Sequence, residues 1–188
     1  MRDVVFKRRL VEQARIEKGH RVLDLGCGTA TLTILIKKMY PQAEVFGLDG
    51  DPKILEIARA KVAEAGLDIT LAQGMAFELP YPDTSFDRVL SSLLLHHLTR
   101  ENERQTLTEV FRVLRHNGEL HVAEFGKPHN ALMYLISLIM RRLEETSDNI
   151  MGLLPDMIRK VGFEQVQETA RYMTIFGTLS FYRAWKPL

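Results

Sequence analysis

Short apolar runs that favour β-strands alternate with helical patterns along most of the chain, and this alternation limits the possible folds more than any other feature. The runs are rich in Val, Leu, Ile or Phe and are bounded by Gly, Asp or Pro: Arg21–Leu25, Glu44–Leu48, Ile69–Gln73, Phe86–Ser91 and Glu119–Phe125. The helical patterns between them are Thr29–Met39, Pro52–Ala65 and a series through Leu107, Val110, Phe111 and Leu114. Strands separated by helices predict a parallel sheet that helices cover on both faces.

The two ends of the chain extend this pattern. Apolar residues on one stripe predict an N-terminal helix at Asp3–Lys18, within residues 1–19. A short helix and two strand-like stretches with almost nothing between them end the chain: Pro155–Val161, Phe163–Thr169 and Tyr172–Trp185. A short connection permits only an antiparallel hairpin. We therefore predict one α/β domain over residues 1–188, with a doubly wound, Rossmann-like sheet of seven strands, mainly parallel, and an antiparallel C-terminal hairpin.

Residues 129–150 contain a stretch, Ala131–Met140, that is apolar almost all round at helical spacing. Such a segment favours burial on more than one face. A core helix, a dimer contact, a lid over the substrate and docking on a membrane surface are the alternatives. The residues that would line a pocket under a lid are Leu132, Met133, Tyr134, Ile136 and Met140.

Composition excludes several classes of protein. The chain has 46% hydrophobic residues and a formal charge of +1, which indicates an ordinary globular domain without a basic field for nucleic acid. The single cysteine, Cys27, cannot form an internal disulfide, and no spacing of His and carboxylates predicts a metal site. The N-terminus lacks the apolar run of a signal peptide, and Ala131–Met140 is too short to span a membrane. We expect a cytoplasmic protein with a small-molecule partner; a homodimer is left open.

A glycine turn directly follows the first predicted strand. Gly26-Cys27-Gly28 lies between Arg21–Leu25 and a helix start, an arrangement that brings the backbone close to a ligand beside unpaired N–H groups. Asp49 ends the second strand 21 residues beyond Gly28, where a carboxylate can accept from ribose hydroxyls. An ordinary strand-to-helix turn and a helix-capping Asp49 are the structural alternatives, although Asp51 before Pro52 already suits the cap. Thr31 replaces the third glycine of a dinucleotide motif, and no second nucleotide-binding half follows, which opposes NAD.

The stretch Val22–Thr29 resembles the first motif of class I S-adenosylmethionine-dependent methyltransferases. Other segments resemble the family's later motifs: Gly47–Pro52, Gln73–Leu90, Leu95–Leu98 and Phe111–Leu120. The resemblance runs from roughly Arg21 to Lys127. Within the class, the chain is similar to the small enzymes of ubiquinone and menaquinone biosynthesis and to relatives of these that act on other small molecules.

The resemblance implies a site for S-adenosylmethionine, with S-adenosylhomocysteine as the product. It implies that Asp49 holds the ribose hydroxyls and that the remaining cofactor-binding residues are Asp24, Gly26, Gly28, Thr29, Gly50, Met75, Ala76 and Ser92. Met75 departs from the family, because Asp or Asn commonly stands there and meets the adenine amino group. A lost hydrogen bond of this kind is worth about 0.5–1.5 kcal/mol, so we expect weaker binding.

The methyl acceptor and the catalytic residues are not readable from the sequence. His96 and His97 follow the fourth strand, whose carboxyl end faces the cofactor crevice of a doubly wound fold, so either could act as a base or touch the substrate. Packing or capping of the next turn is the structural alternative. Lys7-Arg8-Arg9 is interpreted as a solvated helix face. A non-catalytic methyltransferase-like binding protein and a nicotinamide-dependent oxidoreductase are the rival functions.

Overall fold

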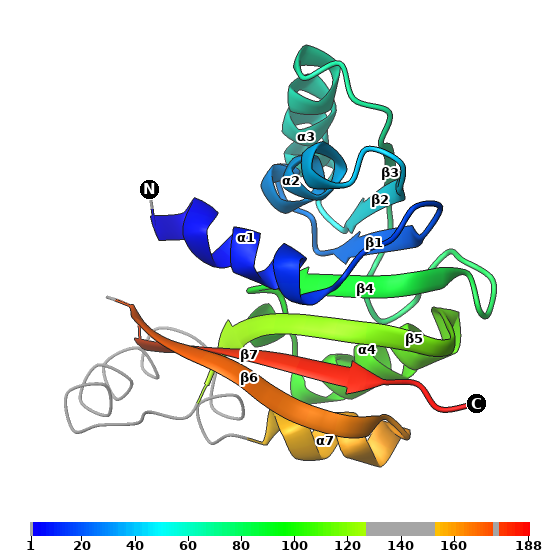
Figure 1. Cartoon of the computed structure of the whole chain (residues 1–188), viewed down its shortest axis with the longest axis vertical. Coiled ribbons are helices and arrows are strands. Elements are labelled where there is room, and N and C mark those ends of the chain that lie inside the picture. Colours follow the sequence, from blue (N-terminus) through cyan, green and yellow to red (C-terminus); the bar gives the residue numbers. More distant parts are fainter. Residues whose placement is uncertain (1, 127–152, 175–176) are drawn as a thin grey trace.

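A computed structural model describes residues 2–126, 153–174 and 177–188 (Figure 1). The segment 129–150, with Tyr134 and the other residues predicted to line a pocket, lies outside the described residues. The proposed lid, core helix and dimer contact therefore stay predictions.

The described strands form one seven-stranded sheet in the order β3-β2-β1-β4-β5-β7-β6. Their bounds are β1 Arg21–Leu25, β2 Glu44–Asp49, β3 Thr70–Gln73, β4 Phe86–Ser92, β5 Leu114–Phe125, β6 Glu164–Thr174 and β7 Gly177–Trp185. Strands β1 to β5 pair in parallel, whereas β7 runs antiparallel to both β5 and β6. The predicted fold class is confirmed.

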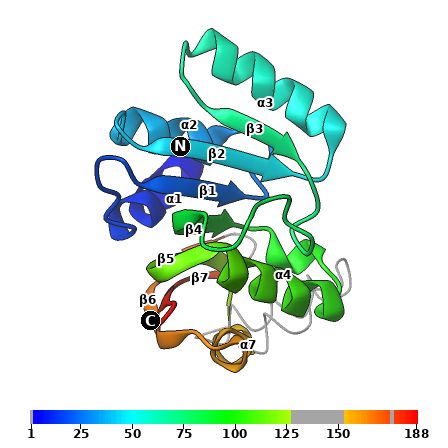
Figure 2. The ribbon, with the colours of Figure 1, turned by 90° about the vertical axis from the view of Figure 1, so that its right-hand side faces the viewer.

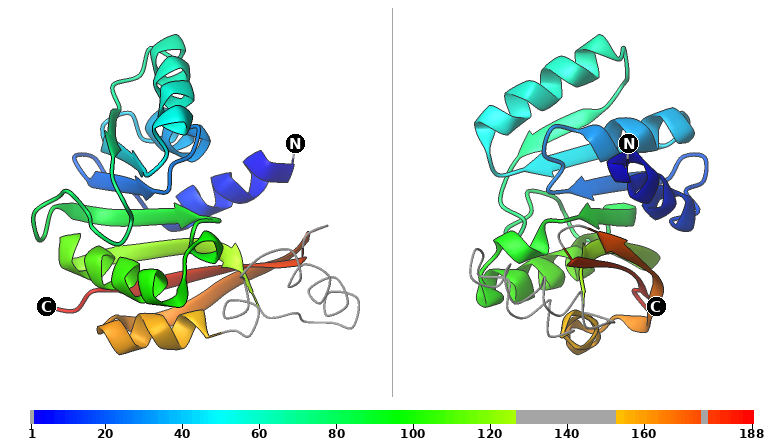
Figure 3. Two further views of the ribbon diagram at one scale, coloured as in Figure 1. Left: turned by 180° about the vertical axis from the view of Figure 1, so that it is seen from behind. Right: turned by 90° about the vertical axis from the view of Figure 1, so that its left-hand side faces the viewer.

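Helices cover both faces of this sheet (Figure 2). Their bounds are α1 Arg2–Gln13, α2 Thr31–Met39, α3 Pro52–Glu64, the 3-10 turn η1 Leu95–His97, α4 Arg100–Val113 and α7 Leu154–Val161. Helices α1 and α2 bury Leu10, Val11 and Ile36 against one face, and α4 and α7 bury Leu107 and Ile158 against the other. The view from behind shows α4 lying along β5 (Figure 3). Helix α3 packs through Leu55, Ala58 and Val62 in a third cluster with Cys27.

Three helix boundaries differ from the prediction. Helix α2 begins at Thr31 rather than Thr29, because Ala30 adopts a left-handed φ of 60°. Helix α1 ends at Gln13 rather than Lys18, because Arg15 adopts a φ of 45°, which a helix cannot contain. Helix α4 ends at Val113, and Leu114 opens β5 in an extended conformation, paired with Phe86 of β4. Helical spacing alone placed Leu114 on the helix, but strand pairing takes it into the sheet.

The C-terminal hairpin is antiparallel, as predicted, but its first strand is longer. Tyr172 pairs with Leu179, so it belongs to β6 and not to the last strand. Its ring packs on Phe181 with centroids 5.2 Å apart, and Phe181 is buried against α1. Burial of this aromatic pair extends β6 past the predicted end at Thr169.

The strand order places a crevice at the carboxyl ends of β1 and β4. The chain leaves β1 toward α2 on one face of the sheet and leaves β4 toward α4 on the other face. Ligands of doubly wound folds bind where the order of the strands reverses in this way.

Candidate functional site

The glycine turn after β1 is fastened to the neighbouring strand. The backbone N–H groups of Gly26 and Cys27 both donate to the carbonyl of Leu48 at 2.9 Å. Gly26 has a φ of 71°, and a Cβ there would lie 2.7 Å from the side chain of Leu94. Gly28 has a φ of 54°, so glycine is favoured at both positions.

A cavity of about 720 Å³ opens beside this turn. It falls within the size range of small-molecule sites. Seven residues that the sequence predicted for the site line it: Asp24, Gly26, Gly28, Thr29, Asp49, Ser92 and His97. Gly50, Met75, Ala76 and His96 do not line it, and Tyr134 lies outside the described residues. Most of the predicted site is thus brought together in one place.

Asp49 joins the end of β2 to the glycine turn. Its Oδ2 accepts from the N–H of Gly28 at 2.8 Å, and its Oδ1 accepts from the N–H of Asp51 at 3.0 Å. Asp51 itself accepts from the N–H groups of Lys53 and Ile54 and so caps α3. The carboxylate of Asp49 is therefore held at the cavity wall, and Asp51 performs the capping.

Asp24 is a buried carboxyl group in the same wall, only 1% exposed. The hydroxyl of Thr33 donates to its Oδ2 at 2.6 Å. Burial raises the pKa of Asp24 to about 6, against the lowering effects of Thr33 and of the positive charge of Lys7. Asp24 is therefore mainly ionised at neutral pH, whereas the neighbouring thiol of Cys27 is protonated, because burial and the charges of Asp24 and Asp49 raise its pKa.

Lys7 lines the cavity, which corrects part of the interpretation of Lys7-Arg8-Arg9 as a solvated face. Arg8 and Arg9 are exposed, but Lys7 is half-buried. It lies three and four residues before Leu10 and Val11, the buried stripe of α1, and seven before the buried Ala14 just after the helix. A cation at this spacing on an apolar helix face was the signal in the sequence.

The loop after β3 lies next to the cavity. Gly74 donates its N–H to the carbonyl of Asp49 at 3.1 Å, and Ala76 is buried. Met75 is half exposed, and its sulfur lies 3.0 Å from where a Cβ on Gly50 would be. The thioether therefore occupies the space directly over Gly50.

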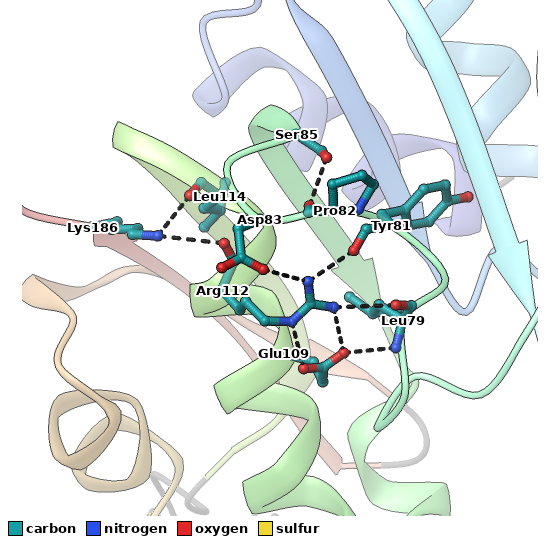
Figure 4. A network of polar contacts seen from close by, with 9 residues as sticks. All are labelled: Leu79, Tyr81, Pro82, Asp83, Ser85, Glu109, Arg112, Leu114 and Lys186. Carbon is teal, nitrogen blue, oxygen red and sulfur yellow. Dashed lines mark hydrogen bonds and ion pairs between the residues drawn. The ribbon is translucent and has the colours of Figure 1, made fainter.

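Helix α4 fixes the continuation of this loop (Figure 4). The guanidinium of Arg112 donates to the carbonyls of Leu79 and Tyr81 at 3.1 and 2.8 Å and pairs with Asp83 at 2.8 Å. Glu109 pairs with Arg112 at 2.7 Å and accepts from the N–H of Leu79 at 2.8 Å. A planar, multidentate donor of this kind restrains both the position and the direction of the loop.

The two predicted histidines follow β4 and differ in their surroundings. His97 is exposed and lines the cavity. His96 is buried, and its Nδ1 lies 2.8 Å from Oε1 of Glu124, at the end of β5. The two imidazole rings lie side by side, with centroids 3.9 Å apart. Ser92, the last residue of β4, contributes to the cavity wall.

Sequence reasoning missed several residues of the cavity wall. They come from α2, α3 and the segment after β4: Thr31, Leu32, Asp51, Ile54, Leu93 and Leu94. The apolar ones, Leu32, Ile54, Leu93 and Leu94, follow the same spacing as core residues, so no local pattern distinguishes them from the core. Within the described ranges, no group of His, Cys, Asp and Glu could hold a metal ion, and no helix has the length and apolar character needed to cross a membrane.

Comparison with known proteins agrees with this geometry. A family model described as a methyltransferase domain matches residues 22–118, just over half of the chain. A demethylmenaquinone methyltransferase of Thermus thermophilus is 35% identical over 134 residues, which cover 71% of this chain and 60% of that protein. The demethylmenaquinone methyltransferase of Deinococcus radiodurans is 31% identical over 190 residues, covering 97% of this chain and 77% of that protein.

Solved structures share the fold at lower identity. The YcgJ protein of Bacillus subtilis superimposes with a TM-score of 0.79 at 18% identity, covering 98% of this chain and 99% of that one. Together with the family model and the curated relatives, this confirms the resemblance that the sequence motifs indicated. The chain therefore belongs to the class I S-adenosylmethionine-dependent methyltransferase family and is similar to its demethylmenaquinone methyltransferases.

Proposed function

We propose that this chain transfers the methyl group of S-adenosylmethionine to a small aromatic molecule of the hydroquinone type. One observation carries the proposal: the glycine turn, Asp24 and Asp49 line a single cavity at the carboxyl ends of the central parallel strands. The relatives named as demethylmenaquinone methyltransferases support a reduced quinone as acceptor.

The chemistry of the cavity wall suits the two ends of the cofactor. Each oxygen of Asp49 accepts one backbone N–H and has a further lone pair, so the carboxylate can also accept from two ribose hydroxyls. Asp24 would face the ammonium of the methionine part, and Lys7, half-buried on α1, would face its carboxylate. Gly26, Gly28, Thr29 and Ser92, the remaining wall residues predicted from the sequence, would surround the same part and the ribose.

The adenine would lie toward Met75 and Ala76. Gly50 provides space for the thioether of Met75, and a sulfur can pack against an aromatic ring. The buried Ala76 would offer its N–H to an adenine nitrogen. With a thioether at position 75 in place of a carboxylate, we expect the adenine amino group to be bound less tightly than in relatives that have Asp or Asn there.

The cofactor, when bound, supplies a methyl group on a positively charged sulfur. The protein contributes alignment of the acceptor with that methyl group and exclusion of water, because displacement at the methyl carbon needs an in-line approach. Cys27 takes no part as a nucleophile, since its thiol stays protonated.

Transfer of a labelled methyl group tests the proposal. The protein is incubated anaerobically with S-adenosylmethionine carrying a tritiated methyl group and with a short-chain reduced demethylmenaquinone. We expect label in the extracted quinol and stoichiometric S-adenosylhomocysteine. Cofactor binding without transfer to a panel of small acceptors would favour a methyltransferase-like binding protein, and tight NADH binding without S-adenosylmethionine binding would favour an oxidoreductase.

Three predictions about the whole protein stand beside this proposal. We expect a single domain over residues 1–188, a cytoplasmic location and a small-molecule partner without nucleic acid. Size-exclusion chromatography with light scattering would decide between a monomer and the homodimer that the sequence leaves open.

A further inference from the structure

The carboxyl ends of the strands arrange the parts of the reaction along one edge of the sheet. The strands there come in the order β3, β2, β1, β4. Met75 follows β3, Asp49 ends β2 and the glycine turn follows β1, so the proposed positions of adenine, ribose and methionine have the same order. Strand β4 is next. An acceptor that reaches the methyl group from beyond the methionine part therefore meets the residues that follow β4.

Two leucines directly after β4, Leu93 and Leu94, line the cavity. Both are half-buried. Leu93 packs against the core on the α1 side of the sheet, and Leu94 packs against the core on the α4 side. Ser92 and His97 are the polar residues of the cavity wall here. The end of β4 thus offers a mainly apolar surface, whereas the wall at β1 and β2 carries two carboxyl groups.

The side chain of Leu94 lies on the glycine turn. Its Cδ1, Cδ2 and Cγ atoms are between 2.7 and 3.0 Å from the place that a Cβ on Gly26 would occupy. Because Gly26 has no Cβ, the isopropyl group of Leu94 can approach the turn this closely. Leu94 and Gly26 both line the cavity. The isopropyl group therefore lies beside the turn that is proposed to hold the methionine part of the cofactor.

The backbone of Leu93 sets the direction of this segment. Leu93 has a φ of 57°, a left-handed conformation that is costly for a residue with a Cβ. Its N–H donates to the carbonyl of Ala123 on β5 at 2.9 Å, so the end of β4 stays bound to β5 while the chain turns. Strained residues of this kind persist where the surrounding structure requires them, and they are common at ligand sites.

We propose that Leu94 is a specificity-determining residue of the methyl transfer: its isopropyl group packs on the ring of the acceptor, and Leu93 positions it there. This inference rests on the proposed function and deepens it, because it assigns recognition of the acceptor to contact with an apolar ring. Apolar contact increases with the area that is removed from water. Of two acceptors with the same hydroxyl groups, the one with the larger ring system is therefore used better.

Two acceptors and a matched control test Leu94. 1,4-Dihydroxynaphthalene and 1,4-dihydroxybenzene carry the same hydroxyl groups on two rings and on one ring. Leu94→Ala removes the isopropyl group. The control is Leu98→Ala, because Leu98 is also half-buried and packs against the same core cluster but does not line the cavity. For each protein we would measure kcat/KM for both acceptors without oxygen, the dissociation constant of S-adenosylmethionine and the unfolding temperature.

We expect the wild-type protein to have the higher kcat/KM with the two-ring acceptor. Leu94→Ala should lower this preference about tenfold or more, because apolar contacts of this size discriminate acceptors by that factor. Leu98→Ala should leave the preference within about twofold of the wild type, and both variants should bind S-adenosylmethionine within about threefold of the wild type. A purely structural role of Leu94 would lower kcat/KM by the same factor for both acceptors.

Leu93→Gly and Leu93→Ala test the positioning role. Both variants remove the side chain, but only glycine adopts a φ of 57° without cost, so the Gly variant should unfold about 2–4 °C above the Ala variant. The same two changes at Arg15, which is exposed and has a φ of 45°, are the control. We expect the same order of unfolding temperatures at Arg15 and a lower preference for the two-ring acceptor in the Leu93 variants alone. An unchanged preference in both Leu93 variants would overturn the role of Leu93.

The outcomes separate this inference from the proposed function. Absence of S-adenosylmethionine binding, or of transfer to either acceptor, in the wild-type protein would overturn the proposed function itself. A wild-type protein without preference, an equal loss for both acceptors in Leu94→Ala, or a loss of cofactor affinity alone would overturn only the role of Leu94. If Leu94→Ala fails to fold, Leu94→Val removes a single methylene and should lower the preference about fourfold; an unchanged preference would then overturn the inference.

Discussion

Replacing Asp24 by Asn should make the ligand-free protein more stable at pH 8. A rise in the pKa of Asp24 from 3.8 to about 6 corresponds to about 3 kcal/mol, at about 1.4 kcal/mol per pKa unit. The folded pKa of this acid lies above the unfolded one, so stability is highest below about pH 4 and is lost as the pH rises to about 6. Asn has the same shape and can accept the hydroxyl of Thr33, so the variant avoids the cost of a buried charge.

Urea unfolding followed by the fluorescence of Trp185 measures this effect. We expect Asp24→Asn to raise the free energy of unfolding by about 1–3 kcal/mol at pH 8 and by roughly half as much at pH 5. The exposed Asp68→Asn is the control and should change stability by less than about 0.5 kcal/mol at either pH. A less stable Asp24→Asn protein at pH 8 would refute the reasoning, because the carboxylate would then be stabilised by its surroundings.

The same substitution should act on the cofactor in the opposite direction. If the ammonium of S-adenosylmethionine lies beside Asp24, loss of the charge should weaken binding about 10- to 100-fold, since a hydrogen bond to a charged group is worth about 1.5–3 kcal/mol. Calorimetry measures the dissociation constant of S-adenosylmethionine for both proteins. A gain in stability with undiminished affinity would place the ammonium elsewhere.

Three further substitutions test other parts of the site. Asp49→Ala should raise the dissociation constant of S-adenosylmethionine about 10- to 100-fold in calorimetry, and an unchanged value would leave Asp49 with only its role in fastening the glycine turn. Met75→Asp should lower that constant up to about tenfold, because a carboxylate would accept from the adenine amino group; weaker binding would mean that the thioether packs on the ring. Arg112→Lys removes the planar donor that holds the loop carbonyls, so it should lower the free energy of unfolding by about 1–3 kcal/mol and weaken cofactor binding. Arg104→Lys, on the exposed side of α4, is the control and should leave the free energy of unfolding and the cofactor affinity unchanged within error.

Local periodicity was sufficient to predict the strands of the sheet, while the resemblance to the methyltransferase family supplied Asp24, Thr29 and Ser92 of the cavity wall. The glycine turn and Asp49 are adjacent to strand ends, so their positions follow once the strands are assigned. Leu114 was assigned to a helix because its spacing from Leu107 is helical, while its pairing with Phe86 is a long-range contact that no local pattern contains.

Other parts of the site depend on contacts between distant residues. Glu124 lies 28 residues from His96, and the sequence around Glu124 does not indicate which side chain its carboxylate contacts. Lys7 could have been found, because it falls on the buried stripe of α1, but a run of three basic residues was more simply interpreted as solvated. Its role depends on α1 packing beside the cavity, which is decided by tertiary structure.

A crystal structure with S-adenosylhomocysteine and 1,4-dihydroxynaphthalene would test the central claim most directly. We predict the ribose hydroxyls at the carboxylate of Asp49, the ammonium beside Asp24, and the acceptor in the same cavity. Density for the cofactor product outside this cavity, or ribose hydroxyls that make no contact with Asp49, would contradict it.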